Sequence, residues 1–114
     1  MTEETNVLIH WKGLRSEEDI HNHLANRCRH IAAEFPETNH YELRIEPNRR
    51  EIQCHGHVNG KRTRIAAHTE SLPTARQAAD SVLDKLEREL RREHDKRIFS
   101  RRRRAQKDQL KRVP

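Results

Sequence analysis

The sequence predicts an α+β domain in which two helices cover one face of a four-stranded sheet. Two segments carry apolar residues at intervals of three or four, which is the period of an amphipathic helix. Three segments between them alternate apolar and polar residues, which is typical of strands with one buried face. A short apolar segment precedes the first helix, so the predicted element order is β-α-β-β-β-α.

The first strand and the first helix are predicted before Pro36. Residues 7–11 form a short apolar run, which Lys12-Gly13 ends. Ser16 is placed to cap a helix with an acidic first turn, and Pro36 stops that helix. The apolar stripe of the helix consists of Ile20, Leu24, Cys28, Ile31 and Phe35.

Three antiparallel strands are predicted in the middle of the chain. Their apolar positions are Tyr41, Leu43 and Ile45, then Ile52, Cys54, Gly56 and Val58, then Thr63, Ile65 and Ala67. Pro47-Asn48 is expected to turn the chain after the first of these strands. Asn59-Gly60 is a strong hairpin signal and is expected to turn it after the second.

The second helix is expected to begin near Pro73-Thr74, with Ser71 as its cap. The apolar stripe of this helix consists of Ala75, Ala79, Val82, Leu83, Leu86 and Leu90. Because the stripe ends at Leu90, we expect the helix to project from the domain beyond this point. We expect it to fray by about Arg101.

The composition predicts one small domain with a one-sided core. The chain has 114 residues, and Leu, Ile, Val and Phe make up only about a fifth of them, near the level typical of disorder. We therefore expect a disordered N-terminus over residues 1–5, a single domain over residues 6–98 and a basic, disordered tail over residues 99–114. The acidic N-terminus and the lack of long apolar runs predict a cytoplasmic protein.

The positive charge is concentrated toward the C-terminus. Residues 1–70 carry 10 Lys or Arg against 11 Asp or Glu, whereas residues 71–114 carry 14 against 7. The densest basic run consists of Arg101, Arg102, Arg103 and Arg104. This block favours a polyanionic partner, and nucleic acid is preferred to a membrane because the tail has few large apolar residues.

The predicted second helix has a basic and an acidic side. The basic ridge consists of Lys85, Arg88, Arg92 and Lys96. The acidic flank consists of Asp80, Asp84, Glu87 and Asp95. At 1.5 Å per residue the ridge is ~16 Å long, which suits contact with several phosphates. The alternative is an ordinary solvated face with local ion pairs such as Glu87–Arg91.

The outward side of the predicted sheet offers a second basic surface. Its members are His55, His57, Arg62, Arg64 and His68. None of these positions is Phe, Tyr or Trp, so recognition by base stacking is not expected. Phosphate contact is the expected mode of binding.

The sequence gives little support for metal binding or catalysis. The densest group of metal-ligand residues is Cys54-His55-Gly56-His57, but on a strand Cys54 points away from the two histidines. Two histidines are fewer than the four ligands of a structural zinc site. No nucleophile and base can be paired from their spacing, and there is no Gly-rich phosphate loop. We expect a protein that is not an enzyme and uses no metal, cofactor or small-molecule substrate.

Residues 78–96, AADSVLDKLERELRREHDK, resemble the last helix of the ribosome hibernation promoting factor family, which includes ribosome-associated inhibitor A. The matching positions are Ala78, Asp80, Asp84, Lys85, Leu86, Arg88, Leu90, Arg92, Asp95 and Lys96. The turn His57-Val58-Asn59-Gly60 and the predicted element order also fit. The chain resembles a short, sigma-54 modulation protein-like member of this family.

The resemblance implies a factor that inhibits translation in stressed cells. Such proteins bind the small ribosomal subunit and its rRNA in the mRNA and tRNA channel, and they catalyse no reaction. By position, the basic ridge supplies the rRNA contacts. Further contacts are expected from Arg62 and Arg64 at the sheet edge and from Arg101, Arg102, Arg103 and Arg104 in the tail. Away from the ribosome we expect a monomer.

Two other functions fit the same residues. One is a general module for double-stranded RNA or other nucleic acid, which would use the same helix and the basic tail as a phosphate clamp. The other is a protein adaptor in which the acidic flank binds the partner and the basic charge is incidental.

Overall fold

The structure, a computed structural model, describes residues 5–111, with side chains described as far as residue 103. Its elements are β1 (Asn6–Trp11), α1 (Glu18–Glu34), β2 (Thr38–Asn48), β3 (Glu51–Gly60), β4 (Thr63–His68) and α2 (Ala75–Lys111). The α+β class and the order β-α-β-β-β-α are therefore confirmed. Residues 1–4, which carry most of the predicted disordered N-terminus, lie outside the described residues.

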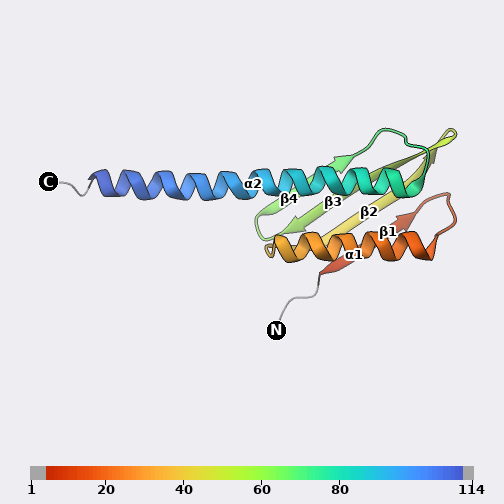
Figure 1. Cartoon of the computed structure of the whole chain (residues 1–114), viewed down its shortest axis with the longest axis horizontal. Helices are drawn as coiled ribbons and strands as arrows, with labels where there is room; N and C mark the ends of the chain where they lie inside the picture. The colour runs from red at the N-terminus through yellow and green to blue at the C-terminus, as the bar shows by residue number, and fades with distance from the viewer. Residues whose placement is uncertain (1–4, 112–114) are drawn as a thin grey trace.

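The four strands form one sheet in the order β1-β2-β3-β4. β1 runs parallel to β2, whereas β2, β3 and β4 pair antiparallel to their neighbours. A parallel pair needs a crossover connection, and α1 provides it between β1 and β2. Both helices lie on the same face of the sheet, and α2 continues far beyond it (Figure 1). The other face of the sheet is left open.

The core lies between the sheet and the two helices. Its larger members are Leu24, Cys28, Ile31, Phe35, Tyr41, Leu43, Ile45, Cys54, Val58, Ile65, Val82, Leu83, Leu86 and Leu90. The buried faces predicted from the helical and strand periods are confirmed. Gly56 permits close packing of α2 on β3, because a Cβ there would lie 2.6 Å from Val82 Cγ1 and 2.8 Å from Leu43 Cδ2.

Both hairpin turns lie two residues later than the sequence predicts. Pro47-Asn48 and Asn59-Gly60 are still paired in strands, and the turns are formed by Arg49-Arg50 and Lys61-Arg62. Each turn places one arginine in the left-handed region, with φ 62° at Arg49 and 64° at Arg62. Gly60 serves close packing instead of the turn, because a Cβ there would collide with the carbonyl oxygen of Glu37.

Both predicted helix caps are wrong. Residue Glu17 precedes α1 in extended conformation and makes no side-chain capping bond, so Ser16 does not cap this helix. At α2 the Oγ1 atom of Thr74 accepts a hydrogen bond from the backbone N–H of Gln77 at 3.1 Å. Ser71 instead accepts a hydrogen bond from the amide of Asn48, because residues near Leu72 pair with β3 before the helix begins.

α2 continues to Lys111, past the point near Arg101 at which we expected it to fray. Residues 99–111 are therefore helical where we expected a disordered tail. The end of the apolar stripe ends packing against the sheet, but it does not end the helix. The segment contains no Gly or Pro and is rich in Arg, Lys, Gln and Ala, which favour helix. In the described part of the chain, no helix is both long and apolar enough to cross a membrane.

Candidate nucleic-acid interface

Three contacts hold α2 against the body of the domain as far as Arg97. Arg91 Nη2 donates to Glu34 Oε1 at 2.8 Å, and the His94 ring packs edge-on against Phe35 with centroids 6.1 Å apart. Arg97 Nη2 donates to the backbone carbonyl of Arg62 at 2.8 Å. The next side chains along α2 are exposed, so we define the projecting segment as residues 98–111.

Three residues of the acidic flank of α2 face α1, whereas the fourth, Asp95, is exposed beside the basic ridge. Arg27 Nη1 donates to Asp80 Oδ1 at 3.1 Å, and its Nη2 donates to Asp84 Oδ1 at 2.9 Å. His23 Nε2 lies 3.0 Å from Asp80 Oδ1, and Glu87 lies 3.7 Å from Arg27. Burial disfavours the charged guanidinium, but the hydrogen bonds to the two aspartates raise the pKa of Arg27 above its ordinary value. These carboxylates join the two helices and are not free to bind a partner.

The four side chains of the basic ridge are all exposed, as the sequence predicts. Lys85 is tethered to the sheet, because its Nζ donates to the carbonyl oxygen of His68 at 2.9 Å. Arg92 forms a local pair with Glu89 at 3.2 Å. Arg88 and Lys96 form no ion pair with any residue whose side chain the structure describes. Arg88, Arg92 and Lys96 are therefore the members of the ridge that are best placed to contact phosphate.

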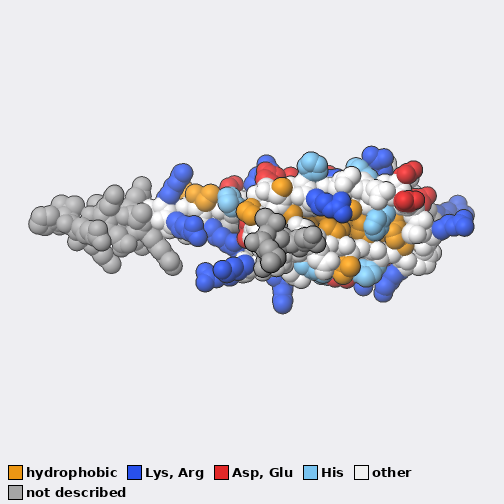
Figure 2. Space-filling view, turned by 90° about the horizontal axis from the view of Figure 1, so that it is seen from below, with side chains coloured by type: hydrophobic (Ala, Val, Ile, Leu, Met, Phe, Trp, Pro, Cys, Tyr) orange, Lys and Arg blue, Asp and Glu red, His pale blue; other side chains and the backbone are white. Residues whose placement is uncertain are grey.

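Two shallow hollows along α2 gather five of the ten basic residues predicted for binding. The first is a groove lined by Arg88, Arg91, Arg92, Asp95, Lys96, Phe99 and Ser100. The second is lined by Arg62, Lys96, Arg97, Ser100 and Arg101. The two hollows share Lys96 and Ser100, so they form one continuous basic surface. Lys and Arg side chains are gathered where α2 leaves the body of the domain (Figure 2).

The two arginines predicted at the sheet edge lie in different places. Arg62 belongs to the β3–β4 turn and lies beside α2, because Arg97 binds its backbone carbonyl. Arg64 is exposed on the open face of the sheet, which is the face that α2 does not cover. Arg62 therefore joins the basic surface of α2, and Arg64 does not.

The predicted tail residues extend this surface along the projecting segment. Arg101, Arg102 and Arg103 are exposed, and the Arg103 guanidinium lies over the Phe99 ring at 5.1 Å from its centroid. The side chain of Arg104 lies outside the described residues. Arg97 and Phe99 are not among the predicted site residues, although Arg97 follows the ridge residue Lys96 directly and Phe99 lies seven residues after Arg92, two turns further along the same side of the helix.

The cysteines are structural. Cys28 and Cys54 are both free and buried, and burial raises the pKa of each thiol to about 12. Neither thiol is therefore ionised at neutral pH, as a nucleophile would need to be. Cys54 points into the core while His55 and His57 point outward, as the strand alternation predicts.

The sequence analysis missed a group of side chains on the open face of the sheet. His40, Glu42 and His57 lie together there, although the histidines belong to different strands. Spacing along the chain does not show this group. Its only signal in the sequence is that these residues occupy outward positions of two neighbouring strands.

A comparison with known families matches residues 7–98 to the family described as Sigma 54 modulation protein / S30EA ribosomal protein. The match spans the sheet, α1 and the part of α2 that packs on the body. The chain belongs to this family. Membership in the S30EA family makes it a ribosome-associated factor, a class whose members are generally not enzymes.

Solved structures show the same fold as this S30EA-family chain. A ribosomal subunit interface protein from Coxiella burnetii has a TM-score of 0.72 at 13% identity, covering 80% of this chain and 99% of that one. The N-terminal domain of Protein Y from Thermus thermophilus has a TM-score of 0.65 at 14% identity, covering 78% and 97%. At these identities the likeness concerns the fold alone. No curated protein sequence matches the chain.

Proposed function

We propose that this protein binds the small ribosomal subunit, occupies its mRNA and tRNA channel and so inhibits translation as a hibernation factor. The observation that carries the proposal is the continuous, exposed basic surface of α2 in a chain that belongs to the S30EA family. The protein would act by occupancy alone, in the cytoplasm, as a monomer before it binds. No cofactor or reaction is needed.

The chemistry of the surface suits folded rRNA. The guanidinium groups of Arg62, Arg88 and Arg92 present planar donors that match phosphate oxygens, and Lys96 adds a point charge between the two hollows. Phosphate contacts position a protein without reading sequence, and their strength depends steeply on salt. Specificity for the ribosome would then come from the shape of the channel and from the spacing of its phosphates.

A general nucleic-acid module is the alternative, and the projecting segment favours it. Arg101, Arg102 and Arg103 are exposed on a helix that has left the body of the domain, where they can reach any phosphate backbone. The adaptor function is not favoured, because Asp80, Asp84 and Glu87 are engaged by Arg27.

Co-sedimentation with isolated small subunits tests the proposal. The double variant Arg88→Glu/Arg92→Glu reverses two exposed charges of the basic ridge and should weaken binding by roughly 100-fold, from the loss of two charge-assisted contacts. The control is Arg49→Glu/Arg50→Glu, which makes the same change of charge in the exposed β2–β3 turn. This control should bind like the wild type.

The outcomes separate the two functions. Preference for intact small subunits over naked rRNA, lost only in the Arg88/Arg92 variant, supports the hibernation factor. Equal affinity for intact small subunits and for naked rRNA, at matched salt, favours the general module. Equal weakening by the Arg49/Arg50 control would mean that net charge, not the α2 surface, governs binding, and it would contradict the proposal.

A further inference from the structure

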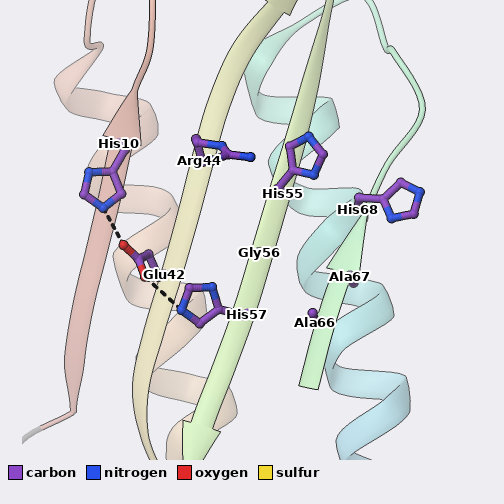
Figure 3. Close-up of a pocket in the computed structure, with 9 residues that line it drawn as sticks. All are labelled: His10, Glu42, Arg44, His55, Gly56, His57, Ala66, Ala67 and His68. Carbon is purple, nitrogen blue, oxygen red and sulfur yellow. Dashed lines mark hydrogen bonds and ion pairs between the residues drawn. The ribbon is translucent and has the colours of Figure 1, made fainter. Parts of the chain in front are cut away.

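The open face of the sheet is rich in histidine. Its outward positions on the strands include His10, His40, His55, His57 and His68. A shallow hollow of about 410 Å³ on this face is lined by His10, Glu42, Arg44, His55 and His57, among others (Figure 3). This face is separate from the basic surface of α2, which packs on the other side of the sheet.

The strand register brings three imidazoles around one carboxylate. Glu42 on β2 lies directly opposite His57 on β3, and His40 is two residues earlier on the same face of β2. His10 reaches Glu42 from β1, the parallel neighbour of β2. Three adjacent strands therefore contribute to one cluster.

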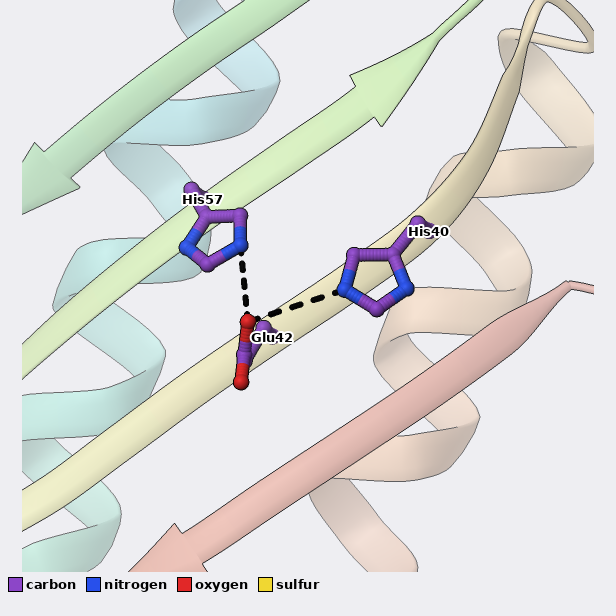
Figure 4. A group of neighbouring side chains, drawn as sticks. All are labelled: His40, Glu42 and His57. Atoms are coloured by element: carbon purple, nitrogen blue, oxygen red, sulfur yellow. Dashed lines mark ion pairs between the residues drawn. The ribbon is translucent and has the colours of Figure 1, made fainter.

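The distances within this cluster are short. His10 Nε2 lies 2.7 Å from Glu42 Oε1, and His57 Nε2 lies 2.8 Å from Glu42 Oε2. His40 Nε2 lies 3.6 Å from the same Oε2 atom (Figure 4). The ligand atoms offered by His40, Glu42 and His57 all lie within 4.8 Å of one another. Arg44 points toward His55 in Figure 3, away from Glu42.

We propose that His40, His57 and Glu42 form a binding site for one divalent transition-metal ion, with Zn²⁺ as the best fit. Two imidazole nitrogens and one carboxylate oxygen are ligand types of zinc, and water can fill the fourth position of the tetrahedron, whereas Mg²⁺ and Ca²⁺ require sites made mainly of oxygen. Ligand atoms bound at 2.0–2.1 Å in a tetrahedron lie roughly 3.3 Å apart, so the three groups, now within 4.8 Å of one another, would draw together by side-chain rotation.

The surroundings of the cluster suit this role. The hydrogen bond from His10 lowers the pKa of Glu42, so its carboxylate is ionised at neutral pH, as a ligand must be. His40 Nδ1 lies 3.2 Å from Asn6 Nδ2, so zinc binding through Nε2, which leaves the ring proton on Nδ1, would require the Asn6 amide to turn its oxygen toward the ring. Zinc and protons compete for the same imidazole nitrogens, so binding should weaken as the pH falls.

Calorimetric titration of the metal-stripped, full-length protein with Zn²⁺ tests the proposal. The wild type should bind one ion per chain, more weakly at pH 5.5 than at pH 7.5, because protons compete for the imidazoles. The variants His57→Gln and Glu42→Gln should each lose at least about tenfold in affinity. Mg²⁺ should give no binding heat at the same concentrations.

His55→Gln is the matched control. His55 and His57 lie on the same strand with similar side-chain exposure, 39% and 40%, and each contacts one glutamate. His55 pairs with Glu46, outside the cluster, so its replacement should leave zinc affinity unchanged. Circular dichroism without zinc should show all variants folded, because the replaced side chains point away from the core.

Zinc should also raise the unfolding temperature of the wild type, because the ion would bind the folded chain and join β2 to β3. This increase should be smaller in Glu42→Gln and unchanged in His55→Gln. Absence of zinc binding by the wild type would overturn the proposal. Equal affinity in the wild type and His57→Gln, or a loss confined to His55→Gln, would assign binding to other histidines and overturn it as well.

Discussion

At the scale of single residues, Arg62 has two separable roles. Its backbone has φ 64°, which is costly for any side chain with a Cβ, and its side chain lines the hollow shared with Lys96 and Arg101. Arg49 has the same backbone requirement, with φ 62°, in the other hairpin turn. The pair therefore allows the contribution of the charge to be measured apart from the contribution of the backbone.

The substitution Arg62→Gly should weaken binding to small subunits without destabilising the fold. Glycine adopts positive φ without strain, so the free energy of unfolding should stay within about 1 kcal/mol of the wild type or rise. Loss of one phosphate contact should weaken binding by roughly tenfold. Denaturant unfolding and co-sedimentation measure the two effects.

The control Arg49→Gly relieves the same backbone conformation but should bind like the wild type. If both variants bind normally, Arg62 makes no contact with RNA. If Arg62→Gly unfolds, the turn depends on the arginine side chain, and our description of its two roles is wrong.

At the scale of elements, α1 and α2 are joined by charge as well as by apolar packing. Arg27 on α1 contacts Asp80, Asp84 and Glu87, three carboxylates that lie on one side of α2. The guanidinium is 25% exposed, so its ion pairs are less screened by solvent than those on an open surface.

Arg27→Met should therefore lower the free energy of unfolding by about 1–2 kcal/mol, because it removes the cation that all three carboxylates share and leaves only the partners that Asp80 and Glu87 have elsewhere. Arg29→Met is the control, since Arg29 is exposed on α1 and its side chain donates only to Asn26 within the described residues. Both variants should bind small subunits normally. Loss of binding by the Arg27 variant, with the fold intact, would instead implicate the acidic flank in binding.

The projecting segment of α2 is expected to contribute to binding and not to stability. Removal of residues 99–114 should leave the unfolding transition unchanged, since the last contacts of α2 with the body that we identify are made by Arg97. Affinity for small subunits should fall but persist, because the basic ridge remains.

Thermal unfolding and co-sedimentation of the truncated chain measure these effects. A lowered unfolding temperature would show that the segment packs on the domain in solution. Complete loss of binding would make the segment, not the ridge, the principal site.

Regular periodicity made most elements predictable from the sequence. The buried stripes around Leu24 and Leu86 and the alternation around Cys54 predict which faces form the core, because one-sided burial imposes a period of 3.6 or 2. The hairpin turns were misplaced because Gly60 is required by close packing against Glu37, a tertiary contact with no local signal. The sequence predicts fraying near Arg101 because no apolar stripe anchors the helix there, whereas the helix-favouring residues of this segment continue it to Lys111.

The candidate sites also differ in how far the sequence alone predicts them. The basic ridge could be predicted because its members repeat along one helix. The position of Arg62 beside α2, the contact of Arg27 with the acidic flank and the cluster around Glu42 all depend on segments that are distant in sequence. Only the three-dimensional structure brings these residues together.

At the scale of the whole molecule, the protein is a compact body with a long basic arm. Its radius of gyration is 18.0 Å and its longest extent is 68 Å, whereas a compact domain of this length has a radius of about 13 Å. The sheet, α1 and the part of α2 before residue 98 form the body, and the basic surface runs along α2 from this body onto the projecting segment (Figure 1). This shape would suit the proposed insertion into a channel lined by rRNA, where the arm and the adjoining edge of the body would contact phosphates together.

The central claim is that this surface places the protein in the mRNA and tRNA channel, and competition on the small subunit tests it most directly. Small subunits would be loaded with labelled mRNA and tRNA and titrated with the protein at fixed salt. We predict that wild-type protein displaces both labels and that Arg88→Glu/Arg92→Glu does not. Simultaneous binding of the protein, mRNA and tRNA to one subunit would contradict the claim, even if affinity for the subunit were high.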